Sequence, residues 1–365
     1  MRPLVALLVV AVLAAGCGGG TDSGPFATSS RGAAPVTASP EATTSTGPRV
    51  VRTVASGLRV PWGIAFLPDG TAVVTERDTD RVLLVTSGGQ VTPVGTVKGD
   101  SRGESGLLGV AVSPQFAQDH TVFFYVTTTR DNRIVKARLD GTSLGPTTPV
   151  LTKIPAGNIH DGGRLAFGPD GYLYASTGET GDSSLAQDPS SLGGKILRIT
   201  TTGRPAPGNP DPDSPVWTIG HRNVQGLAFD PDGHLWASEF GDQTWDELNL
   251  ITRGTNYGWP KAEGRVESGE FRNPKVVWST DDASPSGLAY LDGHLWLGAL
   301  HGQRLWRVTV SGTRASDPTD FFVGQYGRLR TVVAAPDGNL WVTTSNRDGR
   351  GNPKASDDRI LEIAP

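Results

Sequence analysis

One sequence phrase recurs six times in this chain and constrains its fold more than any other feature. Each copy has a short apolar run, a turn that resembles Pro-Asp-Gly, and a second run that ends near Trp, Tyr or Thr. Proline fixes φ in a turn, aspartate hydrogen-bonds the turn backbone and glycine takes a positive φ, so each copy predicts an antiparallel hairpin. The copies begin 44 to 62 residues apart, at Pro61, Gly106, Gly162, Val224, Pro285 and Leu329.

This interval matches repeats of one four-stranded sheet, with longer intervals where loops are inserted. We therefore predict an all-β fold, a six-bladed β-propeller with four-stranded antiparallel blades, over residues 50–365. A β-sandwich uses similar turns, but it gives no reason for one phrase to recur. The 48 glycines and 27 prolines agree with a turn-rich all-β domain.

The N-terminus has a different character. Arg2 precedes an apolar run over residues 4–15, which is typical of a secretory signal and too short for a durable transmembrane span. Cys17 follows in Ala-Ala-Gly-Cys, which resembles a bacterial lipobox, so we expect residues 1–16 to be removed and Cys17 to be acylated. Cys17 is the sole cysteine of the chain, which excludes an internal disulfide. The alternative is a soluble secreted protein in which this cysteine is incidental.

Residues 17–49 contain this cysteine and then mostly Gly, Ser, Thr, Ala and Pro, a composition typical of a flexible tether. We therefore expect an extracytoplasmic protein that is lipid-anchored to the bacterial cell membrane through Cys17. The net charge of −4 shows no basic footprint, which argues against a nucleic-acid partner.

Hairpin geometry predicts that two ionisable residues of the third copy meet. The turn of this copy is centred near Asp170, with His160 before the first strand and Glu179 after the second. Because the two strands run antiparallel, His160 and Glu179 should lie close together at the open end of the hairpin.

Two later copies should bring polar residues together in the same way. In the fourth, whose turn is centred near Asp232, residues 221–223 should lie opposite residues 239–242, and in the sixth Arg328 and Arg330 should lie at the corresponding end. Polar groups from several blades therefore meet at one rim, around a central pocket that we regard as the candidate active site.

A family resemblance is carried by motifs that occur in order along residues 50–365. The motifs are Gly-Leu-Leu-Gly from Gly106, His-Asp-Gly-Gly-Arg-Leu from His160, Gly-His-Arg-Asn-Val-Gln-Gly-Leu-Ala-Phe from Gly220, Glu-Phe-Gly-Asp from Glu239, Asp-Glu-Leu-Asn-Leu-Ile from Asp246, Asn-Tyr-Gly-Trp-Pro from Asn256 and Arg-Leu-Arg from Arg328. Together they resemble the signature of the soluble PQQ-dependent glucose and aldose sugar dehydrogenases.

The resemblance implies a catalytic role for three residues. His160 matches the base that takes the proton of the sugar C1 hydroxyl while hydride passes to PQQ, and Glu179 matches the carboxylate that holds this base. Arg222 would stabilise charge on the quinone oxygen, with Asn223 as a neutral donor beside it. The alternative for His160 is a turn histidine without chemistry.

The resemblance also implies residues that contact the cofactor. Arg328 and Arg330 would bind the carboxylates of PQQ through their guanidinium forks, although arginines exposed on a strand are common. Trp278 matches an aromatic residue of the cofactor pocket, with a core tryptophan as the alternative. Glu104 stands where the family usually has glutamine, and His301 where glucose dehydrogenases have lysine, so both reduce positive charge near the cofactor.

Calcium is the second implied cofactor. Its ligands would be the carbonyl oxygens of Gly241 and Asp242 and the carboxylate of Asp246, all oxygen donors of the kind this ion prefers. The family often has proline where this chain has Asp242, a change that a carbonyl ligand tolerates. Similar loops occur in many propellers, so the calcium expectation rests on the resemblance.

Two functions are compatible with these residues. The first is PQQ- and calcium-dependent oxidation of an aldose sugar at C1 to the lactone, with transfer of electrons to an acceptor that the sequence does not identify. The alternative is a non-catalytic carbohydrate- or protein-binding propeller of the same ancestry, which the departures at Glu104 and His301 favour.

Overall fold

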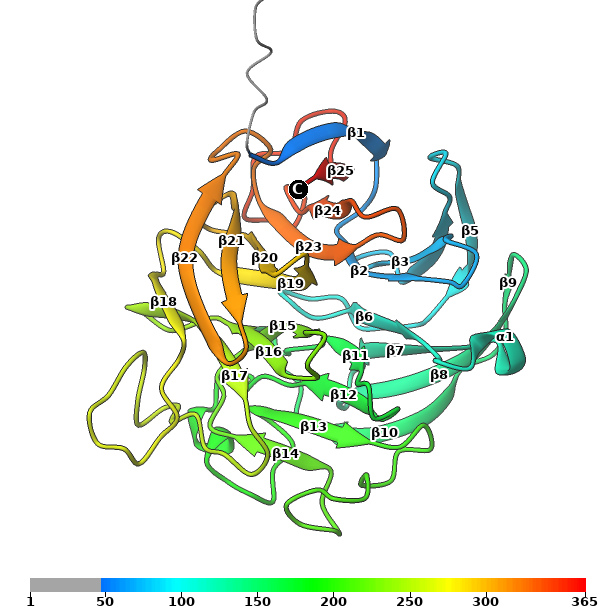
Figure 1. The fold of residues 1–365 in the computed structure, drawn as a ribbon. Helices are drawn as coiled ribbons and strands as arrows, with labels where there is room; N and C mark the ends of the chain where they lie inside the picture. Colours follow the sequence, from blue (N-terminus) through cyan, green and yellow to red (C-terminus); the bar gives the residue numbers. More distant parts are fainter. Residues whose placement is uncertain (1–46) are drawn as a thin grey trace, which may run out of the picture. The chain divides into compact units, whose positions relative to one another are not determined.

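The computed structural model describes residues 47–365, which form a six-bladed β-propeller of antiparallel blades, as predicted (Figure 1). The innermost strands of successive blades contact one another in the order β2, β6, β11, β15, β19 and β23, and β23 contacts β2 again. This closed ring places the start of every inner strand around one central space.

The first three blades contain the first three copies of the phrase. Blade 1 is β2 (Pro61–Phe66), β3 (Ala72–Glu76), β4 (Arg81–Val85) and β5 (Val91–Thr96). Blade 2 is β6 (Leu107–Val112), β7 (Thr121–Thr127), β8 (Asn132–Asp140) and β10 (Thr148–Ile154), with the short β9 (Ser143–Leu144) on β8. Blade 3 is β11 (Leu165–Phe167), β12 (Leu173–Ser176), β13 (Lys195–Ile199) and β14 (Val216–Ile219).

The remaining copies form the other three blades. Blade 4 is β15 (Val224–Phe229), β16 (Leu235–Glu239), β17 (Trp245–Ile251) and β18 (Val276–Ser279). Blade 5 is β19 (Pro285–Leu291), β20 (His294–Ala299), β21 (Arg304–Ser311) and β22 (Arg314–Phe321). Blade 6 is β23 (Leu329–Ala334), β24 (Leu340–Thr344), β25 (Ile360–Ala364) and β1 (Arg49–Ala55).

The ring is closed by a strand that the repeated phrase does not predict. Strand β1 pairs antiparallel with β25, with Arg49 opposite Ala364 and Thr53 opposite Leu361. Figure 1 shows the blue β1 beside the red β25. The N-terminal strand thus supplies the outer strand of the last blade, so hydrogen bonds between the two ends of the propeller hold the ring together.

The aromatic residue that recurs in the second strand of the phrase packs between neighbouring blades. Trp236, Trp296 and Trp341 lie in β16, β20 and β24, and each is buried in a core between blades. Trp341 contacts the ring of Phe66 from blade 1 edge-on at 5.1 Å. Burial of such large apolar side chains between sheets supplies the main stabilisation of the stack.

Two of the connections between strands contain a short helical turn. The long turn of the second copy contains α1 (Phe116–Asp119), and a 3-10 turn, η1 (Ser183–Ala186), lies between β12 and β13.

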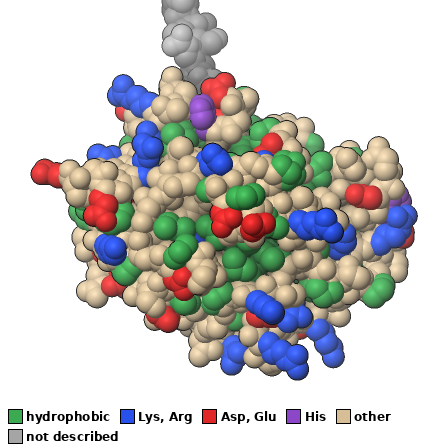
Figure 2. Space-filling model, turned by 90° about the horizontal axis from the view of Figure 1, so that it is seen from below, with side chains coloured by type: hydrophobic (Ala, Val, Ile, Leu, Met, Phe, Trp, Pro, Cys, Tyr) green, Lys and Arg blue, Asp and Glu red, His purple; other side chains and the backbone are tan. Residues whose placement is uncertain are grey.

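Within residues 47–365, no helix combines the length and hydropathy needed to cross a membrane. The predicted signal segment, Cys17 and nearly all of the predicted tether lie outside the described residues. The face in Figure 2 carries acidic and basic side chains interspersed with hydrophobic ones.

Candidate active site

A cavity of about 370 Å³ lies where the inner strands begin. Most of its walls come from residues just before the first strand or just after the second strand of several blades, and Gln225 and Arg330 lie within the first strands β15 and β23. The lining residues are Arg77, Gly103, Glu104, Gln225, Phe240, Ser284, Leu300, His301, Arg328, Arg330, Asp348 and Arg350. Four of the predicted cofactor residues are therefore brought to one cavity, namely Glu104, His301, Arg328 and Arg330.

Arg328 and Arg330 converge on a carboxylate that sequence reasoning missed. Arg328 Nε and Arg330 Nη2 lie 2.9 Å and 3.3 Å from the same oxygen of Asp348. Arg330 also donates to Ser345 Oγ and Gln225 Oε1, and burial lowers its pKa to about 10. Hairpin geometry, which placed the two arginines, would also have located Asp348, because it follows the second strand of the same hairpin.

The lining of the cavity carries an excess of positive charge. Four arginines and two carboxylates contribute to it, and Arg77 is paired outside the lining with Asp78 at 2.5 Å. His301 is at the rim, with a side chain 61% exposed and its Nδ1 3.0 Å from the Thr280 carbonyl oxygen. A ligand with several carboxylates would complement this wall.

His160 and Glu179 meet as hairpin geometry predicted. The His160 Nδ1 and Glu179 Oε1 atoms are hydrogen-bonded, and both side chains are largely buried, with 13% and 3% exposure. Glu179 Oε1 also accepts the Gly181 N–H at 3.1 Å. The bond at Nδ1 leaves Nε2 as the ring nitrogen available to a substrate.

The close approach around His160 depends on a glycine. A Cβ atom at Gly178 would lie 1.8 Å from the carbonyl oxygen of His160, so no other residue fits at this position without backbone movement. Gly178 also forms a β-bridge with Asn223. Because Gly178 has no side chain, the segment that contains His160 can lie directly against the segment that carries Arg222 and Asn223.

Arg222 and Asn223 each present an unpaired donor. Arg222 Nε and Asn223 Nδ2 are buried and have no hydrogen-bond partner within residues 47–365. The backbone around them is fixed, because Glu239 Oε1 accepts the Arg222 N–H at 2.5 Å and Asn223 Oδ1 accepts the Gly162 N–H at 3.1 Å. Buried donors of this kind are normally satisfied, so the pair fits a ligand with an acceptor oxygen.

Asp246 is a buried carboxylate without an ion-pair partner in the described part of the chain. It accepts the Gly241 N–H at 2.9 Å and the Ser284 N–H at 2.5 Å, and burial raises its pKa to about 6. The neighbouring Arg222 pairs instead with Asp242 at 2.8 Å. A buried carboxylate is stabilised by a cation, so Asp246 fits the role of a calcium ligand.

Glu263 shapes the predicted calcium loop and was missed by sequence reasoning. Its Oε1 atom accepts four successive backbone N–H groups, those of Asp242, Gln243, Thr244 and Trp245, at 2.8 to 3.2 Å. Because these N–H groups point towards Glu263, the loop backbone is held in one conformation. No motif in the sequence connects Glu263 with this loop.

Lys195 supports the segment that follows Glu179. Its Nζ donates to the carbonyl oxygens of Leu185, Ala186 and Gly193 at 2.6, 3.1 and 2.7 Å. Burial lowers the pKa of Lys195 to about 8. The ammonium group therefore holds the turn η1 and its return to β13 in place.

Trp278 does not line this cavity, and its contact with the cofactor stays a prediction. It lies in β18, the outer strand of blade 4, and is buried in the core between blades 4 and 5 beside Trp306. Its partner across the sheet is Asp246, so it supports the strand that carries the predicted calcium ligand.

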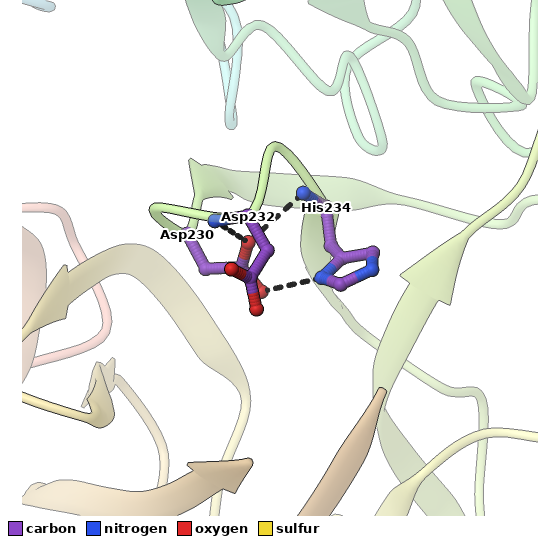
Figure 3. Close-up of side chains that lie close together, drawn as sticks. All are labelled: Asp230, Asp232 and His234. Atoms are coloured by element: carbon purple, nitrogen blue, oxygen red, sulfur yellow. Dashed lines mark hydrogen bonds and ion pairs between the residues drawn. The ribbon is translucent and has the colours of Figure 1, made fainter. Parts of the chain in front are cut away.

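Within residues 47–365, the side chains spaced for a metal are those of Asp230, Asp232 and His234 (Figure 3). They lie in the β15–β16 turn, at the end of the hairpin opposite Glu239. Asp230 already accepts from the Asp232 and His234 N–H groups, His234 Nδ1 and Trp236 Nε1. These hydrogen bonds fix the conformation of the turn and explain why the three side chains lie close together without a metal.

Fold and site together define a class: a six-bladed propeller with a buried His–Glu pair, buried donors that have no partner in the described part of the chain, and an arginine-lined cavity at one end of the ring. The model of the family described as glucose/sorbosone dehydrogenase matches residues 58–353. The chain belongs to this family.

Named relatives cover most of the chain. Aldose sugar dehydrogenase YliI of Escherichia coli is 29% identical over 344 residues, which are 84% of this chain and 90% of that protein. Quinoprotein glucose dehydrogenase B of Acinetobacter calcoaceticus is 32% identical over 58% of this chain and 52% of its own length. The PQQ-bound structure of an aldose sugar dehydrogenase from Streptomyces coelicolor is similar with 54% identity and a TM-score of 0.85, over 87% of this chain and 97% of that one.

Proposed function

We propose that this protein oxidises an aldose sugar at its C1 hydroxyl to the lactone, with PQQ and calcium as cofactors. The observation that carries the proposal is the His160–Glu179 pair, held beside the Arg222 and Asn223 donors that have no partner among residues 47–365. The names of the similar proteins, a PQQ-bound aldose sugar dehydrogenase and a quinoprotein glucose dehydrogenase, support it.

Four residues of the chain have distinct roles in the proposed reaction. PQQ, when bound, supplies a quinone that accepts hydride from the sugar. His160 Nε2 takes the proton of the C1 hydroxyl, and Glu179 keeps the proton on Nδ1 and stabilises the imidazolium that forms. Arg222 Nε and Asn223 Nδ2, buried and without a partner in the described residues, would donate to an acceptor oxygen of the cofactor, where such bonds are strong.

The cavity wall supports binding of a carboxylate-bearing cofactor. Arg328 and Arg330 share Asp348, so two guanidinium groups are held by one carboxylate and retain positive charge. Their geometry is fixed before a ligand arrives, which lowers the entropy lost on binding.

Calcium is proposed for the loop that carries Gly241, Asp242 and Asp246. The support is the buried, unpaired carboxylate of Asp246 in the described chain and the rigid loop that Glu263 holds. Calcium titration of the apoprotein by calorimetry tests this assignment. We expect Asp246→Ala to abolish measurable binding, and unchanged binding in this variant would contradict the assignment.

Apoprotein supplied with PQQ and calcium should oxidise aldoses in a dye-linked assay, with lactone as the product. Binding of PQQ without any sugar oxidation would overturn the proposal and favour the alternative, a non-catalytic carbohydrate- or protein-binding propeller. We further propose that the enzyme is extracytoplasmic and anchored to the membrane through Cys17, on the support of the lipobox-like sequence.

A further inference from the structure

Glu104 and Arg350 form an ion pair in the lining of the cavity. Arg350 Nη1 lies 2.7 Å from Glu104 Oε1, although the two residues are 246 positions apart in the chain. The Glu104 side chain is 14% exposed and that of Arg350 is 57% exposed. Arg350 comes from the loop between β24 and β25 in blade 6, and Glu104 from the loop between β5 and β6, so the pair joins segments of different blades.

The second oxygen of Glu104 contacts the His160 segment. Glu104 Oε2 accepts the main-chain N–H of His160 at 3.0 Å. His160 has a φ of 55°, a left-handed conformation that is unfavourable for a residue with a Cβ atom. The Glu104 carboxylate therefore helps to hold His160 in a backbone conformation that it would not adopt freely.

Other contacts fasten the same two segments independently of Arg350. The Glu104 N–H donates to the Asn158 carbonyl oxygen at 2.9 Å, and Ser105 Oγ donates to the Gly157 carbonyl oxygen at 2.5 Å. Loss of the ion pair should therefore loosen the Glu104 side chain without detaching the loop. This separates a positioning effect from unfolding.

The charge state of Glu104 agrees with this arrangement. Burial opposes its ionisation, but the His160 N–H and the Arg350 guanidinium outweigh burial and hold the pKa of Glu104 below its usual value. Arg350 also offsets the charge that Glu104 adds where the family usually has glutamine. The departure at Glu104 is therefore balanced by a positive charge in the same cavity wall.

We propose that Glu104 is a positioning residue for His160 and that the ion pair with Arg350, from a different blade, holds the Glu104 carboxylate in place. The inference rests on the proposed function, in which His160 is the base. Glutamine at position 104 would still accept the His160 N–H, but it would form no ion pair with Arg350. The two residues thus act as one unit in this chain.

Hydrogen exchange in the apoprotein tests the role of the Glu104–Arg350 ion pair without any cofactor. In Arg350→Gln, we expect amide exchange over residues 157–163 to become about two- to fivefold faster, the size expected for a partly exposed ion pair, with no change in β12. Arg350→Lys should restore most of the protection. Arg102→Gln is the matched control, because Arg102 is an exposed arginine that pairs with Asp100 in the same loop as Glu104.

Kinetics of the loaded enzyme give a second readout. We expect Arg350→Gln and Glu104→Gln each to lower kcat about two- to fivefold with a smaller change in KM, and the double variant to be no worse than either single one. Unchanged exchange over residues 157–163 in Arg350→Gln, or additive kinetic losses, would contradict the proposal that the Glu104–Arg350 ion pair positions His160. If the wild type does not oxidise sugars while the exchange effect is present, the proposed function fails and the coupling of Arg350 to the His160 segment stands.

Discussion

The Nδ1 atom of His160 is hydrogen-bonded to Oε1 of Glu179, across the open end of a complete hairpin. In the proposed function this bond gives the two ring nitrogens different roles: Nδ1 carries the proton shared with the carboxylate, and Nε2 presents a lone pair to the substrate. Glu179 is itself held by the Gly181 N–H, so the imidazole ring has little freedom to rotate.

Removal of the imidazole tests the chemistry directly. His160→Ala should bind PQQ normally but lower kcat by about 10² to 10⁴-fold, the usual contribution of a positioned general base. Glu179→Gln should give a smaller loss, because the base remains while its orientation is impaired. Stopped-flow reduction of bound PQQ measures both effects. His294→Ala is the control, since His294 lies in β20 of another blade; full turnover in His160→Ala would place the base elsewhere.

Loss of one arginine of the cavity wall should affect binding of the cofactor more than turnover. Arg328→Ala removes a guanidinium that is 2.9 Å from Asp348 and leaves the Asp348 carboxylate ion-paired with Arg330. We expect PQQ affinity to fall by about 10- to 100-fold, since charged hydrogen bonds typically contribute about 1.5 to 3 kcal/mol. Titration of the apoprotein with PQQ, followed by absorbance, measures this change. Arg314→Ala, at an exposed position in β22, should bind PQQ as the wild type does.

Glu263 should matter for calcium although it is not expected to touch the ion. Glu263→Ala removes the acceptor of four backbone N–H groups, and we expect about 10- to 100-fold weaker calcium binding, as for other residues that orient metal ligands. Glu263→Gln keeps an oxygen acceptor and should recover part of the affinity. Calorimetry on the apoprotein is the measurement, with the exposed Glu267→Ala as control. Wild-type affinity in Glu263→Ala would show that the loop is ordered without it.

Lys195 gives a pH dependence of stability with a defined sign. Burial lowers its pKa from 10.5 to about 8, so between these pH values the unfolded chain binds more protons than the folded one. Stability should therefore rise with pH in this range, and the advantage of the wild type over Lys195→Met should grow by about 1 to 3 kcal/mol. Urea unfolding at about pH 7.5 and at about pH 10 measures the difference. A constant difference would show that Lys195 is not shifted.

The membrane anchor is tested by one substitution at the N-terminus. Wild-type protein should fractionate with membranes, and Cys17→Ser should be released or remain unprocessed while its dehydrogenase activity is unchanged. One diacylglyceryl group buries two acyl chains, at about 0.8 kcal/mol for each CH₂, which is enough for stable attachment. Wild-type protein found wholly in the soluble fraction would exclude the anchor.

Local sequence determined the hairpins, and the hairpins determined much of the site. The turn and its flanking strands are contiguous, so the contact between His160 and Glu179 and the placement of residues 221–223 beside residues 239–242 follow from antiparallel pairing alone. The repeat of one phrase likewise predicted six blades, because each copy buries the same face against its neighbour.

Tertiary structure decided the contacts between segments that are far apart in the chain. No local sequence pattern predicts three of these contacts: the pairing of β1 with β25, the ion pair between Glu104 and Arg350, and the hydrogen bonds of Glu263 to the proposed calcium loop. The position of Trp278 also needed the tertiary structure: its spacing along the chain does not tell whether the side chain faces the cavity or the core between blades, and the structure places it in that core. The first two of the three contacts exist only once the ring closes, because closure brings blade 6 beside blade 1 and the loop that follows it. The Glu263 contact forms within blade 4, where the sheet brings two of its connecting loops together.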